Sequence, residues 1–334
     1  MKRHTALVLL ATLASLAAVG LFAGFSVNSF LQTPVAPDGE QLVMIPAGSP
    51  LQRIAERLEK SGVIGNADYF TLLARWQGTA TQVQAGEYLF AGPALPGEVL
   101  RRLVKGDVRM LRITLPEGLT LRETAQRMAD FGLCSLDEAL AVVANPELLE
   151  RYDVPATSLE GYLFPETYTL RSNSRVEELV EAMLVQGKTR VQSDMLEAAK
   201  RRGLDRHQLV TLASIIQKEA GNNAEMPLIS AVFHNRLRAG IPLQADPTVI
   251  YGVADFDGNL TRRHLATPTP YNTYQMRGLP AGPIANPGEA ALRAAAWPAE
   301  VDYLYFVARG DGTHQFNTTL VQHNRAVRRY QLGR

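Results

Sequence analysis

Cysteine is almost absent from the chain, because Cys134 is the only one among 334 residues, so no disulfide can form within it. The sequence also lacks a P-loop, a G-x-G-x-x-G turn and any paired-cysteine or H-E-x-x-H metal pattern. An excess of one charge is missing too, since 34 Lys and Arg stand against 33 Asp and Glu. These absences disfavour a disulfide scaffold, a nucleotide-driven enzyme and a nucleic-acid partner. We expect no metal and no cofactor.

One long uncharged run is present at the amino terminus, over residues 5–27, directly after Lys2, Arg3 and His4. A membrane-spanning helix needs about 20 apolar residues, whereas the core of a signal peptide needs about 7–15. The run therefore predicts a single-pass anchor within residues 1–27, with a cleaved signal peptide as the alternative. Because the basic residues precede the span, the rest of the chain is predicted to face the far side of the membrane. An exported region cannot rely on ATP, which favours hydrolysis, elimination or binding.

An internal repeat follows a Pro-containing stretch, residues 28–41, that is predicted to be a linker. Residues 45–64 and 115–134 match at an offset of 70 residues, with six identical positions that include the pairs Pro46 with Pro116 and Gly48 with Gly118. Each copy is predicted to form a short strand, a Pro/Gly turn, an amphipathic helix and a terminating glycine. This punctuation resembles LysM modules, which bind glycans that contain N-acetylglucosamine. The alternative is a common strand-turn-helix unit that binds nothing in particular.

A helical apolar pattern later in the chain holds an acid against apolar side chains. Leu209, Leu212 and Ile216 recur at steps of three and four, which defines one face of a helix. At about 100° per residue, Glu219 lies at the margin of that face, whereas Gln217 points nearly the opposite way. A carboxyl in such a place ionises less readily and can act as a general acid near neutral pH. The alternative is an ordinary surface glutamate near a helix end.

The rest of the carboxyl-terminal half is predicted to be mixed α+β. Helices are expected over residues 176–199, 208–221 and 227–240, with a strand at 303–308 and then a turn that includes GDGTHQF. Residues 241–286 contain little helical pattern and are rich in Pro, Gly, Asn and Tyr. Loops of that length are uncommon and often functional.

Several acids and histidines in this half could take part in chemistry. A glycoside hydrolase normally needs two carboxylates, and the sequence does not show which pair lies at the required spacing. The histidines lack the short spacings of a zinc site. The candidate carboxylates are Glu160, Glu166, Glu219, Glu225 and Asp246.

Long ordered motifs carry a specific family resemblance. The stretch ASIIQKEAGNNAEMPLISAVFHNRLRAGIPLQADPTVIYG resembles the endolytic murein transglycosylase (MltG, or YceG-like) family, as do LEGYLFPETY, TPYNTY, GLPAGPIANPG and YLYFVARGDGTHQF. The resemblance covers nearly the whole chain after the anchor. In that family the ASI-(I/V)-x-K-E segment carries the catalytic glutamate, which implies Glu219 here. Many members have a glutamate where this chain has Gln217, which implies that an acid at that position is not essential.

The resemblance also implies a reaction. The family cleaves the β-1,4 bond between N-acetylmuramic acid and N-acetylglucosamine within nascent strands, which would terminate glycan elongation. Glu219 would protonate the glycosidic oxygen, and its carboxylate would then take the proton of the muramic C6 hydroxyl, which closes on C1 as a 1,6-anhydro end. The residues expected to hold the strand are Asn235, Gln244, Asp246, Tyr271, Asn272 and Glu166. The rivals are a muramidase that uses a second carboxylate, Asp246 or Glu225, and a non-catalytic peptidoglycan-binding scaffold.

These inferences combine into one prediction for the whole chain. It is an α+β protein with an anchor (1–27), a linker (28–41), a LysM-like α+β region with the repeat (42–156) and a catalytic transglycosylase domain (157–334). We expect it in the cytoplasmic (inner) membrane, with its carboxyl-terminal domain on the periplasmic side. The expected partners are peptidoglycan glycan strands and membrane peptidoglycan synthases.

Overall fold

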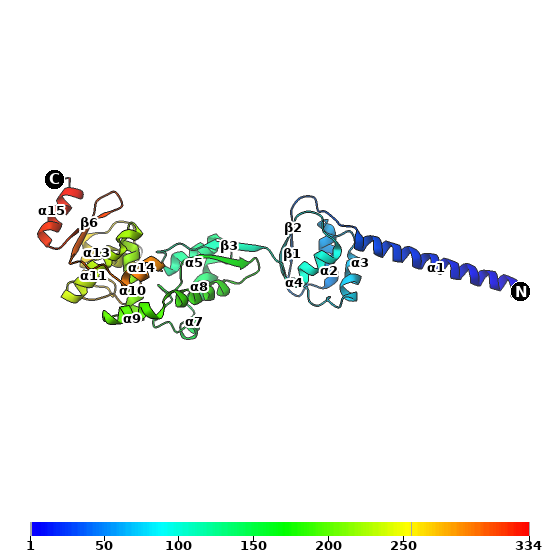
Figure 1. Cartoon of the computed structure of the whole chain (residues 1–334), viewed down its shortest axis with the longest axis horizontal. Helices are drawn as coiled ribbons and strands as arrows, with labels where there is room; N and C mark the ends of the chain where they lie inside the picture. The colour runs from blue at the N-terminus through cyan, green and yellow to red at the C-terminus, as the bar shows by residue number, and fades with distance from the viewer. Residues whose placement is uncertain (1, 255, 334) are drawn as a thin grey trace. The chain divides into compact units, whose positions relative to one another are not determined.

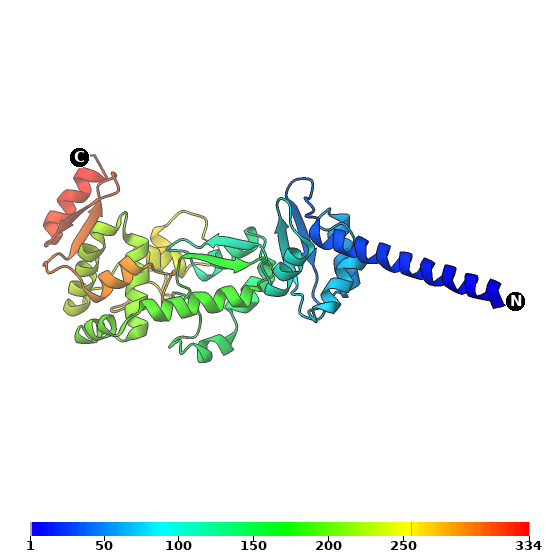
Figure 2. The ribbon, with the colours of Figure 1, turned by 45° about the vertical axis from the view of Figure 1, so that its right-hand side comes forward.

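The computed structural model describes residues 2–254 and 256–333, with side chains of the first helix described at residue 10 and from residue 12 onward. The chain divides into two compact units. Unit 1 contains residues 1–111 and 169–173, and unit 2 contains residues 112–168 and 174–334. Figures 1 and 2 show the helices and strands of both units.

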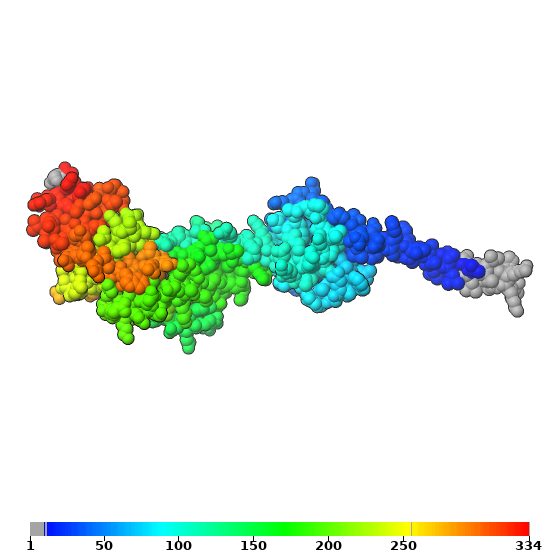
Figure 3. All heavy atoms as spheres, viewed as in Figure 1, coloured from blue at the N-terminus to red at the C-terminus, as the bar shows by residue number. Residues whose placement is uncertain are grey.

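Helix α1 (Lys2–Gln32) begins unit 1 and contains the predicted anchor. Within the described chain, Thr12–Gln32 is the one segment of helix long and apolar enough to cross a membrane, and no part of its apolar stretch is buried in the structure. Leu16 and Phe22, for instance, are 69% and 73% exposed, and the blue helix of Figure 3 shows its side chains uncovered. The helix continues past residue 27, so the predicted linker begins as helix.

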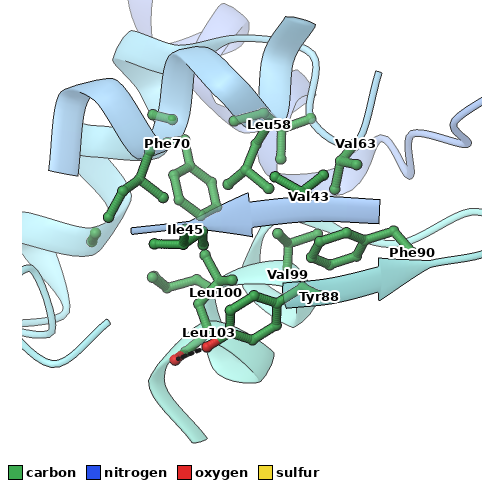
Figure 4. Close-up of a cluster of buried hydrophobic side chains, with 14 of the residues drawn as sticks. Val43, Ile45, Leu58, Val63, Phe70, Tyr88, Phe90, Val99, Leu100 and Leu103 are labelled. Atoms are coloured by element: carbon green, nitrogen blue, oxygen red, sulfur yellow. Dashed lines mark hydrogen bonds between the residues drawn. The ribbon is translucent and has the colours of Figure 1, made fainter. Parts of the chain in front are cut away.

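The core of unit 1 lies between a two-stranded sheet and three helices. Strand β1 (Gln41–Ile45) pairs antiparallel with β2 (Gly86–Phe90). Helices α2 (Leu51–Lys60), α3 (Ala67–Trp76) and α4 (Pro96–Lys105) supply most of the remaining core side chains, and the loop residues Val63, Ile64 and Val108 supply the rest. Figure 4 shows Val43 and Ile45 of β1 and Tyr88 and Phe90 of β2 facing this core, as the period of a strand requires. The Tyr88 hydroxyl donates to the carbonyl of Leu103 at 3.2 Å, so its polar end is satisfied.

Both copies of the repeat have the predicted local structure. The first runs from β1 through a turn to α2 and Gly62, whose φ is 67°. The second runs from β3 (Met110–Thr114) through a turn to α5 (Leu121–Asp130) and Gly132, whose φ is 82°. At such φ values only glycine is free of strain, which explains the matching glycines. The helices of the two copies belong to different units, and the division falls across β3 and its partner strand β4 (Thr167–Arg171).

Unit 2 is mainly helical and is built around α10 (Arg206–Glu219). Every residue from Leu209 to Ile216 is buried, because α10 packs against α9, α11, α12 and α14. A hairpin of β5 and β6, which packs on α15, completes the unit. Its other elements are α6 (Leu136–Val143), α7 (Pro146–Arg151), α8 (Val176–Arg190), α9 (Ser193–Arg201), a 3-10 turn η1 (Asn223–Glu225), α11 (Met226–Ala239), α12 (Asp246–Tyr251), α13 (Arg262–Ala266), α14 (Glu289–Ala296), β5 (Tyr305–Ala308), β6 (His314–Asn317) and α15 (Leu320–Tyr330).

The mixed α+β class, the apolar amino-terminal helix and most of the predicted elements are confirmed. The predicted helix over residues 176–199 is wrong as one piece, because Val191 leaves the helical conformation and separates α8 from α9. Strand β6 lies where only a turn was expected, and it pairs with β5 in the register Ala308 to His314. The LysM-like character of residues 42–156 and its boundary with a catalytic domain at 157 stay predictions.

Candidate active site

Glu219 is the last residue of α10, and the residues at both ends of this helix explain its limits. Asp205 caps the start of the helix by accepting from the Gln208 amide at 2.8 Å. At the other end Ala220 is extended, and Gly221 meets the turn between β5 and β6. A Cβ at Gly221 would lie 2.5 Å from the carbonyl oxygen of Gly312, so only glycine permits this approach.

Glu219 lines a cavity of about 350 Å³ in unit 2. One wall is apolar and comes from β5 and α15, where Phe306, Val307 and Val327 face the space. The polar residues that line it come from α11, α12, β6, α15 and the loops between and after them, and they are Arg236, Gln244, Asp246, Tyr274, His314, His323 and Gln331. Among the residues described, no group of three or more His, Cys, Asp or Glu side chains is placed to hold a metal ion.

The Glu219 carboxyl is suited to act as an acid. Burial raises its pKa to about 8, and the negative charge of Asp246 adds to the shift. The residue is half-buried rather than sealed, so its carboxyl reaches the cavity. In the part of the chain that the structure describes, no hydrogen bond to this carboxyl contributes to its pKa. At neutral pH the group is therefore protonated, with its proton available to a bound molecule.

Asp246 and Tyr274 form a hydrogen-bonded pair at the same cavity. Asp246 is exposed at the first turn of α12, and its Oδ1 accepts from the Tyr274 hydroxyl at 2.6 Å. Burial raises the pKa of Tyr274, and Asp246 raises it further, so the phenol remains a donor. The pair fixes one carboxylate in the cavity that also contains Glu219.

Arg236 fixes the shape of the wall that carries Gln244. Its guanidinium is buried and donates to the carbonyls of Leu304 and Leu243, at 2.7 and 2.9 Å, and to the side-chain oxygen of Gln244 at 3.2 Å. Gln244 has a φ of 55°, a conformation that non-glycine residues seldom adopt and that neighbouring contacts must impose. Arg236 supplies those contacts and so orients the Gln244 side chain.

A model of the YceG-like family matches residues 43–329 of this chain. The chain belongs to the YceG-like family. A relative from Bacillus subtilis named endolytic murein transglycosylase is 34% identical over 325 residues, which cover 92% of this chain and 89% of the relative. A protein of the same name from Streptococcus pneumoniae is 31% identical, covering 80% of this chain and 54% of its own length. This chain thus matches about half of that longer relative.

A solved structure has a fold similar to that of this chain. The crystal structure of a yceG-like protein from Listeria monocytogenes is 30% identical and superimposes with a TM-score of 0.60. The superposition covers 86% of this chain and 98% of the Listeria chain.

Two of the six predicted substrate-binding residues of this family member, Gln244 and Asp246, line the Glu219 cavity. Asn272 does not line it and is fully buried. Its amide nitrogen donates to the carbonyls of Leu265 and Thr267, and its oxygen accepts from the Tyr274 amide at 2.9 Å. Asn272 therefore shapes the loop that presents Tyr274.

The other three predicted residues also lie outside the cavity. Tyr271 packs edge-on against Tyr251, with ring centroids 4.7 Å apart. Asn235 lines a separate groove and donates to the carbonyls of Val301 and Tyr303 at 2.8 and 2.9 Å. Glu166 is exposed and accepts from side chains of α8. Substrate contact by these residues stays a prediction that the cavity does not favour.

Sequence reasoning missed Arg236, Tyr274, His314 and His323 as cavity residues. Tyr274 and His314 lie inside the motifs TPYNTY and GDGTHQF, so their place in these family motifs could have identified them as candidate site residues. His323 carries no such signal. Burial lowers its pKa, and its Nδ1 is buried without a hydrogen-bond partner among the described residues.

Gln217 is directed toward α14. Its side-chain oxygen accepts from the amide of Gly288, which caps the start of α14, at 3.0 Å. It does not line the Glu219 cavity.

A second buried acid, Glu160, lies elsewhere in unit 2. It is 4% exposed, both carboxyl oxygens accept from the Leu121 amide at 3.0 Å, and one accepts from the Tyr251 hydroxyl at 3.0 Å. Burial raises its pKa to about 7, although these hydrogen bonds oppose the shift. Glu160 does not line the Glu219 cavity.

Proposed function

We propose that this protein is an endolytic murein transglycosylase that cuts the glycan strands of peptidoglycan with Glu219 as its catalytic acid and base. The observation that carries the proposal is the half-buried position of Glu219 at the wall of an open cavity, where burial raises the pKa of its carboxyl. Membership of a family whose relatives are named for this activity supports it.

The chemistry follows from the pKa of Glu219. A carboxyl that holds its proton up to about pH 8 can protonate the oxygen of the β-1,4 bond between N-acetylmuramic acid and N-acetylglucosamine. As that bond breaks, positive charge develops on the sugar ring, and the new Glu219 carboxylate lies beside it. The carboxylate then removes the proton of the C6 hydroxyl, whose oxygen closes on C1 to give the 1,6-anhydro end. Glu219 recovers its proton, and no water is consumed.

Asp246 has a supporting role in this scheme. Its charge helps to keep Glu219 protonated, and Tyr274 holds its carboxylate in place. Gln244, fixed by Arg236, offers an amide to sugar hydroxyls. Cutting within nascent strands by such a cavity would terminate their elongation.

Hydrolysis of the same bond is the second candidate, and one observation favours it. A muramidase needs a second carboxylate, and Asp246 lines the cavity with Glu219. Glu225, the other acid considered for that role, is paired with His314.

Mass spectrometry of the products separates these reactions. Un-crosslinked peptidoglycan strands are digested with the full chain in detergent, beside its Glu219→Gln variant. We expect 1,6-anhydro ends from the parent and none from the variant. Reducing ends, heavier by one water, would replace the proposal with hydrolysis. Binding without cleavage by either protein would indicate a scaffold.

The remaining parts of the proposal concern location. We propose that α1 is a single-pass anchor in the cytoplasmic membrane, that the rest of the chain faces the periplasm, and that the LysM-like residues 42–156 hold strands leaving a membrane synthase. The uncovered apolar stretch of α1 supports the anchor. Protease added outside spheroplasts should remove the chain after α1 and leave a protected fragment near the size of α1, whereas full protection would contradict the orientation. Replacing residues 42–111 by an inert spacer should change the length distribution of the released glycans.

A further inference from the structure

The loop that follows α10 holds the β5–β6 hairpin against the cavity. Asn222 donates from its side chain to the carbonyl of Gly312 at 3.1 Å, beside the close approach of Gly221 to the same carbonyl. Both contacts involve the turn that leads into β6. The hairpin is therefore fixed by residues that come directly after Glu219 in the chain.

Glu225, at the end of the same loop, holds His314 at two points. Its Oε1 accepts from the His314 backbone amide at 3.0 Å, and its Oε2 lies 2.8 Å from the ring Nδ1. The two side chains are only 14% and 10% exposed. A carboxylate can only accept, so Nδ1 carries a hydrogen. Phe306 packs perpendicular to the imidazole with ring centroids 5.4 Å apart, which restricts its rotation further.

This arrangement leaves the second ring nitrogen of His314 for the cavity. His314 lines the same cavity as Glu219, and no hydrogen bond between described residues uses its Nε2. In a neutral imidazole with Nδ1 protonated, Nε2 is an acceptor. The other titratable or charged groups at this cavity are Glu219, Arg236, Asp246, Tyr274 and His323.

We infer that His314, oriented by Glu225, is a sugar-binding residue whose Nε2 accepts a hydrogen bond from a hydroxyl or acetamido N–H group of the glycan. The inference rests on the proposed function, because it assigns the sugar to the Glu219 cavity. It gives Glu225 a positioning role in place of the role of a hydrolytic base. It also explains why both a carboxylate contact and a ring contact fix the orientation of one imidazole.

Binding to a protein that cannot cut provides the test. The full-length Glu219→Gln protein is titrated with un-crosslinked glycan strands stripped of their peptide stems, with and without His314→Asn. Asparagine can retain a donor near the position of Nδ1 and has nothing at the position of Nε2. Loss of one hydrogen bond predicts binding weaker by roughly three- to tenfold. In the cutting enzyme, His314→Asn should raise KM by a similar factor and leave kcat nearly unchanged.

Two comparisons separate sugar contact from a structural effect. His314→Gln places an amide near the position of Nε2 and loses the Glu225 contact, so it should bind more tightly than His314→Asn. His264→Asn, which changes a half-buried histidine outside the cavity, should bind within about twofold of the parent. Equal affinity for His314→Asn and its parent would overturn the inference, as would equal weakening by Asn and Gln.

Ring nitrogen resonances give a reading that does not depend on the folding of any position-314 variant. The chain has six histidines, and ¹⁵N labelling of all of them in the Glu219→Gln protein should show one with Nδ1 protonated whose Nε2 signal moves when glycan is added. Six unmoved signals at saturating glycan would overturn the inference. Neither the binding titration nor the ¹⁵N measurement requires cleavage. A failure to cut strands would therefore count against the proposed function, whereas the inference about His314 would still be decided by these two measurements.

Discussion

Two sites in unit 2 hold a buried acid, and they differ in almost every other respect. Glu160 and Glu219 both have a pKa raised by burial, to about 7 and about 8. Glu160 is enclosed and accepts hydrogen bonds from Leu121 and Tyr251, which join α5 to α12. Glu219 lines a cavity, and no hydrogen bond from a described residue contributes to its pKa. A raised pKa therefore identifies a buried carboxyl, whereas access and an available proton identify a reactive one.

The largest expected effect is the loss of cutting in Glu219→Gln. Glutamine keeps the size of the side chain and removes the proton that both steps need, so we expect activity to fall on the order of 10³-fold or more. Release of anhydro-muramic ends from nascent strands measures it. Glu181→Gln, which changes a half-buried partner of Arg151 outside the Glu219 cavity, is the matched control and should cut normally. Substantial activity in Glu219→Gln, with intact strand binding, would show that Glu219 is not the catalytic acid and so would contradict its contrast with Glu160.

The second prediction concerns the stability that Glu160 makes dependent on pH. Its pKa in the folded chain, about 7, lies above its ordinary value of 4.5, so its contribution is fully present below pH 4.5 and is lost as pH rises through 7. The loss amounts to about 3 kcal/mol. Glu160→Gln cannot ionise, so its free energy of unfolding should fall less between pH 4.5 and 8.

Denaturant unfolding at several pH values measures this difference, and Glu219 provides an internal reference because it titrates in both proteins. Glu160→Gln should keep cutting activity within about tenfold of the parent, since it retains acceptors and donors for the contacts between α5 and α12. A folded Glu160→Gln protein as inactive as Glu219→Gln would show that Glu160 also takes part in the reaction.

The third prediction tests the charge that Asp246 adds to the Glu219 site. Activity should fall as pH rises through about 8, because the acid step needs a protonated Glu219. Asp246→Asn removes a negative charge from the cavity, so the alkaline limb of kcat/KM should move to lower pH. Burial, the larger cause, remains, so activity at pH 8 should fall by only about tenfold.

The matched control is Asp194→Asn, in the first turn of α9, which should leave the limb unmoved. The result also separates the two candidate reactions. A hydrolase that uses Asp246 as base or nucleophile would lose several orders of magnitude at every pH, without any shift of the limb.

The sequence predicts those features of the fold that depend on residues close together in the chain, such as the positions and ends of helices. The period of apolar side chains from Leu209 to Ile216 predicts α10 and the margin position of Glu219, and glycine punctuation predicts the ends of α2 and α5. These features follow from helix geometry and from φ values that only glycine adopts readily. The family motifs add the chemical identity of the acid.

Contacts between distant segments could not be predicted in the same way. Asp246 and Tyr274 are 28 residues apart, and Glu225 and His314 are 89 apart, so no local period relates them. Polarity also does not distinguish an amide that binds sugar from one that organises a buried loop. The polarity of Asn272 predicts a sugar contact, but its amide nitrogen donates to backbone carbonyls instead.

The smallest expected effect is at Gln217, two residues before the reactive acid on a different side of α10. The family resemblance implies that a glutamate is acceptable there, and Gln217→Glu tests whether a second acid on α10 changes stability or activity. A carboxylate can accept from the Gly288 amide as the amide oxygen does now, and it would lie at the start of α14, where negative charge is favourable. The Glu117 carboxyl also lies close to Gly288 and opposes that gain by repulsion. We expect stability within about 1 kcal/mol of the parent and activity within about twofold, measured by thermal unfolding and anhydro-end release. Since position 217 lies outside the cavity, rescue of Glu219→Gln by Gln217→Glu would mean that α10 can present either side chain to the glycan.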